Sequence, residues 1–285
     1  MRKLRYTFKT DTLFKMLFVT HQDLLKKLVA ALLGIAPESI SQFVVRNVEM
    51  PPEILGDKFC RLDINMTVNG QLVDLEVQVT DEGDYPERVL YYWARGFSSA
   101  LPAGEVYSTL PRTIVISILD FRLFECAEYH SFFQPLEVTR HTLLSDKMGL
   151  HFFELPKLPA DVEKGDMLLL WLSLFKAETE EELEKIRAMG VPVMSQAINA
   201  YYRITASPEF RELERMREKA RHDEAQALHH AELRGRAEGR AEGRAEGISN
   251  RNIEIARTML ADGEPAGKIL RYTGLTSEEL EAIHP

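Results

Sequence analysis

The sequence lacks the features of membrane proteins and of disulfide-stabilised proteins. No apolar run approaches the roughly 18 residues that a bilayer-spanning helix requires. The basic residues 1–6 continue into polar sequence instead of an apolar segment with a small-residue cleavage site, so we expect no signal peptide. The two cysteines, Cys60 and Cys126, make neither a disulfide framework nor a zinc site on their own. We therefore expect a cytoplasmic protein with no membrane partner.

The chain also lacks an excess of positive charge. It has 35 lysine and arginine residues against 44 aspartate and glutamate residues, which gives a net charge of -9. A protein that coats nucleic acid through charge alone needs clustered basic residues to neutralise the phosphates. The composition argues against such a protein, although a bound metal ion would offset acidic residues locally.

Two alternating segments, 61–68 and 71–79, are joined by the dipeptide Asn69-Gly70. Asn-Gly is the strongest short-range signal for a two-residue type I′ hairpin turn. Such a turn fixes the register of the two strands and pairs position 63 with position 76. The sequence therefore predicts that Asp63 and Glu76 face each other on adjacent strands.

Side chains alternate across a strand, so this hairpin has two different faces. The polar face contains Asp63, Asn65, Thr67, Leu72, Asp74, Glu76 and Gln78, and the apolar face contains Ile64, Met66, Val68, Val73, Leu75, Val77 and Val79. Facing carboxylates repel each other, and a hard divalent ion such as Mg²⁺ or Mn²⁺ would relieve that repulsion. The alternative is a polar face that points into water, as in many antiparallel sheets.

Other segments complete a mixed fold of helices and strands. The periodicity predicts an amphipathic helix over 11–33, a strand over 42–49 and a buried strand over 113–119. Pro86 is placed to open a helix, because a proline in the first turn loses no hydrogen bond. From residue 166 onward the pattern is helical.

Asp63 followed by Glu76-Val77-Gln78 resembles the PD-(D/E)xK nuclease motif, with Gln78 where many members carry lysine. The surrounding motifs resemble the Rpn family of recombination-promoting nucleases, which is also labelled as a family of transposases. These motifs are Asp11-Thr-Leu-Phe14-Lys15, Arg61-Leu-Asp63, Tyr85-Pro-Glu-Arg88 and Pro111-Arg-Thr-Ile-Val-Ile-Ser. The resemblance implies an α/β fold with a PD-(D/E)xK restriction-endonuclease-like core (α-β-β-β-α-β mixed sheet) and a helical C-terminal extension. It also implies Mg²⁺-dependent cleavage of DNA, linked to recombination or transposition.

The resemblance assigns roles to the acidic residues of the hairpin. Asp63, Glu76 and the backbone carbonyl of Val77 would hold one or two Mg²⁺ or Mn²⁺ ions, which would activate water and stabilise charge on the phosphate. Gln78 would orient the water or a phosphate oxygen but adds no positive charge. Asp11 would add a third acid to the catalytic site, and its alternative role is to cap the helix that it begins.

Three further residues are candidates for binding the substrate. Lys15 follows Asp11 by one helical turn. Arg88 could hold a phosphate bidentately, and Tyr92 lies one turn further along the same helix. The alternative for Arg88 is an ion pair with Glu87 or another surface acid.

We expect a nuclease-like domain over 1–160, a helical extension over 161–233, a linker over 234–247 and a small helical tail over 248–285. The linker repeats Gly-Arg-Ala-Glu, so its i,i+4 pairs are like-charged, and each interior glycine costs a helix about 1 kcal/mol relative to alanine. This pattern favours a mobile, marginally helical linker. Residues 277–281 are acidic, which favours a tail that binds a protein partner over a DNA-reading helix-turn-helix.

The residues leave three functional classes open. The favoured class is a metal-dependent DNA endonuclease, which as a homodimer would cut both strands. The second is a non-catalytic DNA-associated or assembly protein on a nuclease-derived fold, in which the acids remain only as a polar face. The third is a DDE transposase of the RNase H type. An acid and an amide on one strand after a short hairpin fit this class less well.

Overall fold

A six-stranded mixed sheet carries the predicted hairpin. The computed structural model describes residues 2–46, 49–50, 60–61 and 64–283, which divide into two units, Met1–Glu214 and Arg215–Pro285. In spatial order the strands are β1 (Phe43–Val45), β4 (Ile64–Val68), β5 (Gln71–Gln78), β6 (Thr113–Leu119), β8 (Met148–Glu154) and β7 (His130–Phe133). The β5–β6 and β6–β8 pairs are parallel, and the other pairs are antiparallel.

The turn between β4 and β5 has the predicted geometry. Asn69 and Gly70 have φ values of 48° and 78°, as a type I′ turn requires. The register pairs Val68 with Gln71 and Ile64 with Leu75, which confirms the predicted pairing over the described part of the hairpin. The pairing of Asp63 with Glu76 stays a prediction, because residue 63 lies outside the described residues.

The strands around the hairpin are shorter than the sequence predicts. The strand expected over 42–49 is reduced to β1 in the main sheet. Glu49–Met50 (β2) pairs instead with Cys60–Arg61 (β3) in a separate two-stranded sheet. Position 61 belongs to β3, and the described part of the hairpin strand predicted over 61–68 begins at Ile64.

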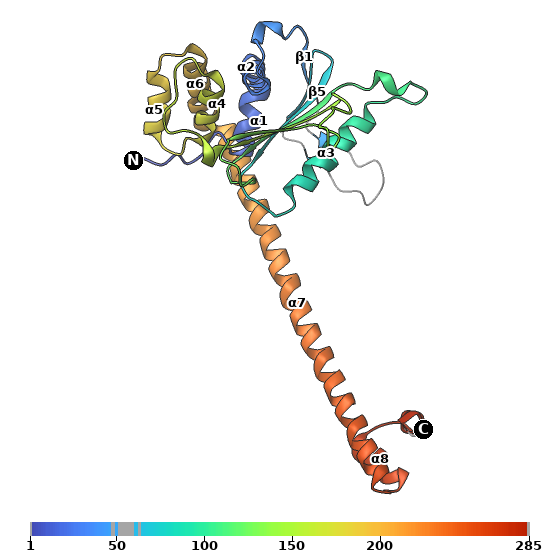
Figure 1. Cartoon of the computed structure of the whole chain (residues 1–285). Helices are drawn as coiled ribbons and strands as arrows, with labels where there is room; N and C mark the ends of the chain where they lie inside the picture. The colour runs from blue at the N-terminus through green and yellow to red at the C-terminus, as the bar shows by residue number, and fades with distance from the viewer. Residues whose placement is uncertain (1, 47–48, 51–59, 62–63, 284–285) are drawn as a thin grey trace. The chain divides into compact units, whose positions relative to one another are not determined.

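Helices cover both faces of the main sheet (Figure 1). The first face carries α1 (Asp11–Thr20), α2 (Gln22–Leu33), α4 (Met167–Lys176), α5 (Glu180–Ala188) and α6 (Pro192–Ala206), whose apolar side chains share one core with β4, β5 and β6. The second face carries α3 (Tyr85–Ser99), which packs on β6 and β8. Short 3-10 helices lie at Pro37–Ser39, Tyr107–Thr109 and Leu155–Lys157. The element order confirms the predicted α-β-β-β-α-β core.

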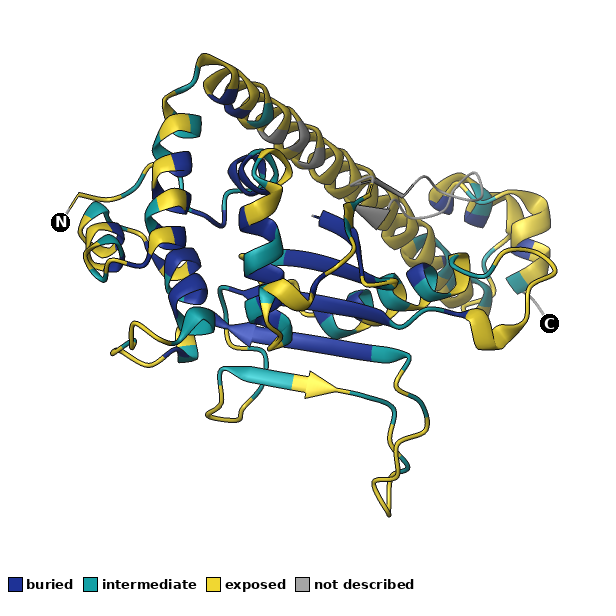
Figure 2. Cartoon of the chain, turned by 90° about the horizontal axis from the view of Figure 1, so that it is seen from above, coloured by how far each residue is buried: buried dark blue, intermediate teal, exposed yellow. Residues whose placement is uncertain are grey.

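The predicted helix over 11–33 is broken into α1 and α2. His21 lies between them with φ -110° and ψ 70°, outside the helical region. Before the break, Phe14 and Phe18 of α1 pack against Phe175 of α4. After it, α2 contributes Leu24 and further leucines to the same core. Figure 2 shows that the strands beneath these helices are mostly buried.

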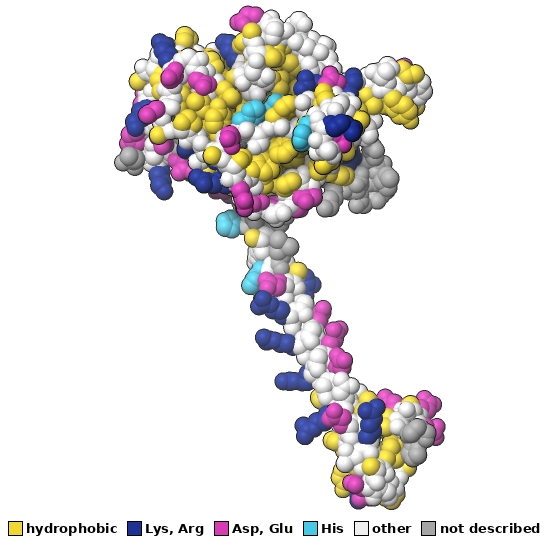
Figure 3. All heavy atoms as spheres, viewed as in Figure 1, with side chains coloured by type: hydrophobic (Ala, Val, Ile, Leu, Met, Phe, Trp, Pro, Cys, Tyr) yellow, Lys and Arg dark blue, Asp and Glu magenta, His cyan; other side chains and the backbone are white. Residues whose placement is uncertain are grey.

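The Gly-Arg-Ala-Glu repeat differs from the expected marginal linker, because it lies inside a continuous helix, α7 (Pro208–Ala261). Arginine, alanine and glutamate are strong helix formers, and a salt bridge of 2.6 Å between Glu232 and Arg236 leads into the repeat. A four-residue repeat on a helix places like residues in stripes, and Figure 3 shows the basic and acidic side chains on opposite sides of this segment. Helix propensity therefore outweighs the glycines here.

The C-terminal unit has a small core of its own. The end of α7 packs with α8 (Ala266–Thr273) and α9 (Ser277–Ile283) through Ala256, Ile269 and Leu280. Gly263 and Gly274 lie between these helices with φ values of 75° and 70°, a conformation that glycine adopts without strain. Among the described residues, no helix is both long enough and apolar enough to cross a membrane.

Candidate active site

The polar face of the β4–β5 hairpin is buried. Asp74 is 1% exposed and Glu76 is 5% exposed, and Asn65 and Thr67 on the neighbouring strand are also buried. This burial contradicts the alternative of a polar face that points into water. Buried carboxylates must be paired, protonated or bound to a cation, because an isolated buried charge is costly, so this face has the chemistry of a site.

Helix α3 approaches this face closely at one residue. A Cβ atom added to Gly96 would lie 3.7 Å from Oδ2 of Asp74 and 3.8 Å from the Thr113 side chain. Glycine at this position therefore gives the helix backbone a close contact with the acid. A Cβ atom at these distances would be in ordinary van der Waals contact, so the helix lies directly against the acid and helps to exclude water from it.

Burial raises the pKa of Asp74 to about 7, and the hydrogen bond from Asn65 Nδ2 and the charge of Arg46 offset part of that rise. Arg46 is held nearby, since its Nε donates to Thr67 Oγ1 at 2.7 Å. Near neutral pH this carboxyl is therefore close to its titration midpoint. A neighbouring cation would stabilise the charged form and lower its pKa.

We expect the Asp74→Asn variant to unfold with a weaker pH dependence than the wild type in EDTA. The pKa of Asp74 is higher in the folded state than in the unfolded state. The contribution of protonated Asp74 to the free energy of unfolding is therefore fully present below pH 3.8 and is lost as the pH rises through about 7. The advantage of the variant should grow from pH 4 to pH 8, by about 1.4 kcal/mol per pKa unit. Urea denaturation followed by tryptophan fluorescence measures this, with exposed Glu87→Gln as control. Parallel profiles for Asp74→Asn and the wild type would contradict the assignment.

A chain of contacts connects Glu76 to Arg88. Glu76 is paired in register with Ser117 of β6, and the Tyr85 hydroxyl donates to Ser117 Oγ at 2.8 Å. The guanidinium of Arg88 lies over the Tyr85 ring, 5.0 Å from its centroid. The first turn of α3 therefore brings a cation toward the acidic face.

Arg88 keeps donor capacity for a further partner. Its Nη1 forms an ion pair of 3.1 Å with Glu82, an acid other than the Glu87 of the sequence-based alternative. Within the described part of the chain, its buried Nε and Nη2 have no hydrogen-bond partner. Two such N–H groups can bind a phosphate oxygen or a carboxylate, so the geometry accommodates both the ion pair and the predicted phosphate contact.

The other predicted site residues take different positions. Asp11 is the first residue of α1, one position after the N-cap residue Thr10, and it pairs with Lys15 at 2.8 Å. Tyr92 is half-buried, next to Tyr91.

Gln78 of the hairpin is partly exposed, and its side chain only weakly contacts the Thr80 carbonyl, at 3.5 Å. Among the residues that the structure describes, no three His, Cys, Asp or Glu side chains gather as a metal site, so the predicted ligand set depends on Asp63.

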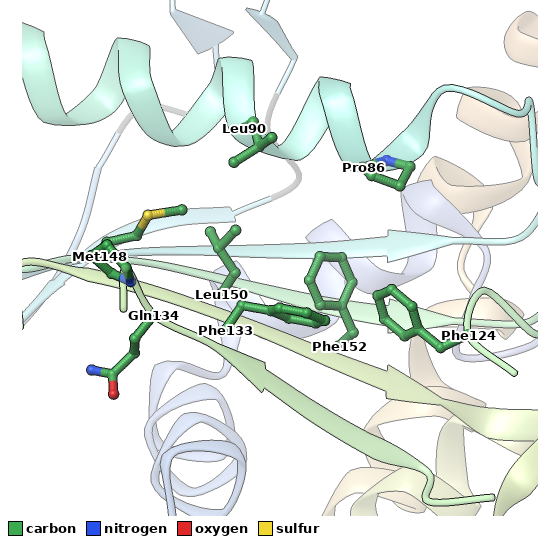
Figure 4. A pocket seen from close by; sticks show the side chains of 9 residues that line it. Pro86, Leu90, Phe124, Phe133, Gln134, Met148, Leu150 and Phe152 are labelled. Carbon is green, nitrogen blue, oxygen red and sulfur yellow. The ribbon is translucent and has the colours of Figure 1, made fainter. Parts of the chain in front are cut away.

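A separate pocket beside α3 has unsuitable chemistry for a phosphodiester. Its cavity volume is about 280 Å³, and its walls include Leu90 of α3 with Phe133, Met148 and Phe152 of the sheet (Figure 4). Phosphates need charged or hydrogen-bonding partners, which these side chains do not supply. The acidic face of β5 is therefore the better candidate for the active site.

A mixed sheet between helical layers, with buried acids on a central strand and Arg88 on the helix that covers their face, is an α/β fold whose site suits a nuclease. Comparison with known families makes this specific. Residues 8–231 match the family described as "PD-(D/E)XK nuclease family transposase", and the chain belongs to this family. This confirms the PD-(D/E)xK fold and the Rpn resemblance. No curated protein and no solved structure matches the chain.

The C-terminal unit requires a correction. Residues 250–285 match the Rpn/YhgA-like nuclease family, C-terminal HTH domain, so the tail interpreted as a partner-binding cap is a helix-turn-helix domain. The structural feature that agrees with such a domain is the packing of α8 and α9 on the end of α7. The first turn of α9 is acidic, with Glu278 and Glu279, so the charge pattern that usually marks a DNA-reading helix is missing from it.

Proposed function

We propose that this chain is a metal-dependent endonuclease that hydrolyses phosphodiester bonds in DNA. The observation that carries the proposal is the buried acidic face of β5, with Glu76 at 5% exposure and Arg88 nearby. Carboxylates held away from water, on a face covered by a helix that carries a cation with spare donors, suit a site that binds a metal ion and a phosphate. Membership of a nuclease family supports the same chemistry.

The donor atoms of this face fit Mg²⁺ or Mn²⁺. Asp74 and Glu76 supply carboxylate oxygens and Asn65 an amide oxygen, which are hard ligands. We propose Glu76, the Val77 carbonyl and Asp63 as the metal ligands, although Asp63 lies outside the described residues. The raised pKa of Asp74 is consistent with a face on which a cation would be stabilising.

The residues around the acids have complementary roles in the proposed reaction. A bound divalent metal would lower the pKa of a water molecule and stabilise charge on the phosphate. Arg88 would hold a phosphate oxygen, with Tyr92 and Lys15 as further contacts to the substrate. Gln78 would orient the water by hydrogen bonding, and Asp11 would add negative charge near the metal.

The proposed substrate is DNA, since the chain also carries a helix-turn-helix domain. Such domains position a protein on duplex DNA by inserting one helix into the major groove. The name of the matching family includes transposase, so we propose a substrate in recombination or transposition. A homodimer would cleave both strands with one site per chain.

Nicking of supercoiled plasmid tests the proposed function. The purified chain should nick the plasmid in Mg²⁺ or Mn²⁺ and leave it intact in EDTA. Added metal should also raise the thermal midpoint, because a ligand that binds only the folded state stabilises it. Absence of both nicking and metal-induced stabilisation would instead favour a non-catalytic, DNA-associated protein on this fold.

A further inference from the structure

A second polar cavity lies away from the acidic face, between the N-terminal segment and helices α5, α6 and α7. It has a volume of about 360 Å³. The charged side chains among its walls are Arg2, Lys3, Arg5 and Arg211, with Glu180 as the acid. We call this cavity the basic cleft. Its four cations against one acid contrast with the net charge of -9 of the whole chain.

The cations of the basic cleft are available to a ligand. Arg2 lies 3.5 Å from Glu180, but its side chain is 81% exposed, so solvent screens this pair. Among the described residues, no acidic oxygen lies within ion-pair distance of Lys3, Arg5 or Arg211, and all three are exposed. Glu181 also lies beside Arg2, since its carboxylate accepts the Arg2 backbone N–H at 3.2 Å. The cleft therefore keeps a net positive charge, which Lys3, Arg5 and Arg211 provide.

The N-terminal segment is held in place, so the cleft is a formed site. The Leu4 N–H donates to the Glu178 carbonyl at 2.8 Å, and Lys3 forms a β-bridge with Thr179. The Tyr6 ring packs edge-on against Phe210, with 4.8 Å between the ring centroids. A cleft whose backbone is already ordered loses less entropy when it binds a ligand.

Internal hydrogen bonds occupy polar groups of the cleft wall. The Tyr201 hydroxyl donates to the Tyr6 carbonyl at 2.7 Å, and the Thr205 hydroxyl donates to the Tyr201 carbonyl at 2.9 Å. These groups are poorly placed to read the edge of a base. What the cleft offers is mainly charge, which recognises an anion without regard to sequence.

We infer that the basic cleft binds backbone phosphates of a nucleic acid strand, without reading its sequence. The choice of a nucleic acid as the anion rests on the proposed function. The cations are spread over the N-terminal segment and α7, an arrangement that suits successive phosphates better than one small anion. The cleft would hold DNA independently of the metal site.

Fluorescence anisotropy of labelled oligo(dT), and of a labelled duplex, tests this inference in EDTA, where cleavage cannot occur. The test variant combines Lys3→Gln, Arg5→Gln and Arg211→Gln in the full chain. The control combines Lys27→Gln, Arg140→Gln and Lys164→Gln, which remove the same charge from residues that do not line the cleft. The helix-turn-helix domain contributes equally in both proteins.

The cleft variant should bind at least about tenfold more weakly than the control at low salt. Its plot of log affinity against log salt should be flatter by about 2, because each lost phosphate contact removes about 0.9 or less from the slope. Equal affinities and slopes for the two variants would overturn the inference. Displacement of the oligonucleotide by millimolar inorganic phosphate would overturn it too, because it would indicate a site for one small anion.

The two proposals can fail separately. A protein that never nicks plasmid but shows the difference between the cleft variant and the control retains the basic cleft as a binding site. A protein that nicks in Mg²⁺ but shows no such difference retains the active site on β5 and loses the cleft.

Discussion

The Glu76→Gln variant is expected to nick supercoiled plasmid at least about 1,000-fold more slowly than the wild type, which corresponds to about 4 kcal/mol of lost transition-state stabilisation. Glutamine keeps the size and one oxygen of the side chain but removes its charge. A hard divalent ion would then lose its best-placed ligand among the described residues. Initial nicking rates in Mg²⁺ and in Mn²⁺ measure the effect.

The matched control for this variant is Glu87→Gln. Glu87 is an exposed acid in the first turn of α3, so its substitution changes the net charge equally without touching the acidic face. We expect Glu87→Gln to nick at the wild-type rate. Equal nicking by Glu76→Gln and the wild type would place the activity elsewhere or in a contaminant.

A folding defect must be separated from a catalytic one. Circular dichroism of Glu76→Gln and of the wild type in EDTA shows whether the variant folds before the nicking rates are compared. The stabilisation by Mn²⁺ should disappear in the variant. A variant that still gains stability from Mn²⁺ but no longer nicks would show that Glu76 acts on the substrate and not as a metal ligand.

The hairpin shows what local sequence determines. Asn69 and Gly70 fix the turn and therefore the register of β4 and β5, because a two-residue turn leaves no freedom to shift the strands. The common face of Asp74, Glu76 and Gln78 follows from alternation alone. Both features were therefore predictable without any tertiary information.

The burial of that face was not predictable from the hairpin itself. It depends on α3, whose Gly96 approaches Asp74 across more than 20 residues of sequence. Nothing in the local pattern of either segment identifies this contact. The raised pKa of Asp74 follows from the same packing, so sequence reasoning placed Asp74 on the polar face without assigning it to the site.

Two errors along the helices have physical causes. Leucine periodicity continues through His21, so the pattern could not mark the break between α1 and α2. In the repeat, glycine and like-charged pairs disfavour a helix, but arginine, alanine and glutamate favour one, and the segment is part of α7. Both errors arise because local pattern is a weak guide to where a helix ends.

The Lys157→Met variant is expected to lose about 3–5 kcal/mol of unfolding free energy, the usual cost of breaking a buried ion pair from one side. Lys157 Nζ lies 2.7 Å from Glu154 Oε2, and both side chains are buried, at 4% and 0% exposure. Glu154 also accepts the Leu123 N–H at 2.6 Å, and Lys157 donates to the Phe124 carbonyl at 2.8 Å. Methionine would leave the carboxylate buried without its cation.

The double variant Glu154→Gln/Lys157→Met shows whether the loss comes from the uncompensated charge. A neutral glutamine can still accept the Leu123 N–H, so the double variant should recover much of the stability that Lys157→Met loses. Urea denaturation followed by tryptophan fluorescence suits this test, because both tryptophans, Trp93 and Trp171, lie in the unit Met1–Glu214. If the double variant is no more stable than Lys157→Met, the loss comes from packing and from the Phe124 hydrogen bond, and the ion pair contributes little.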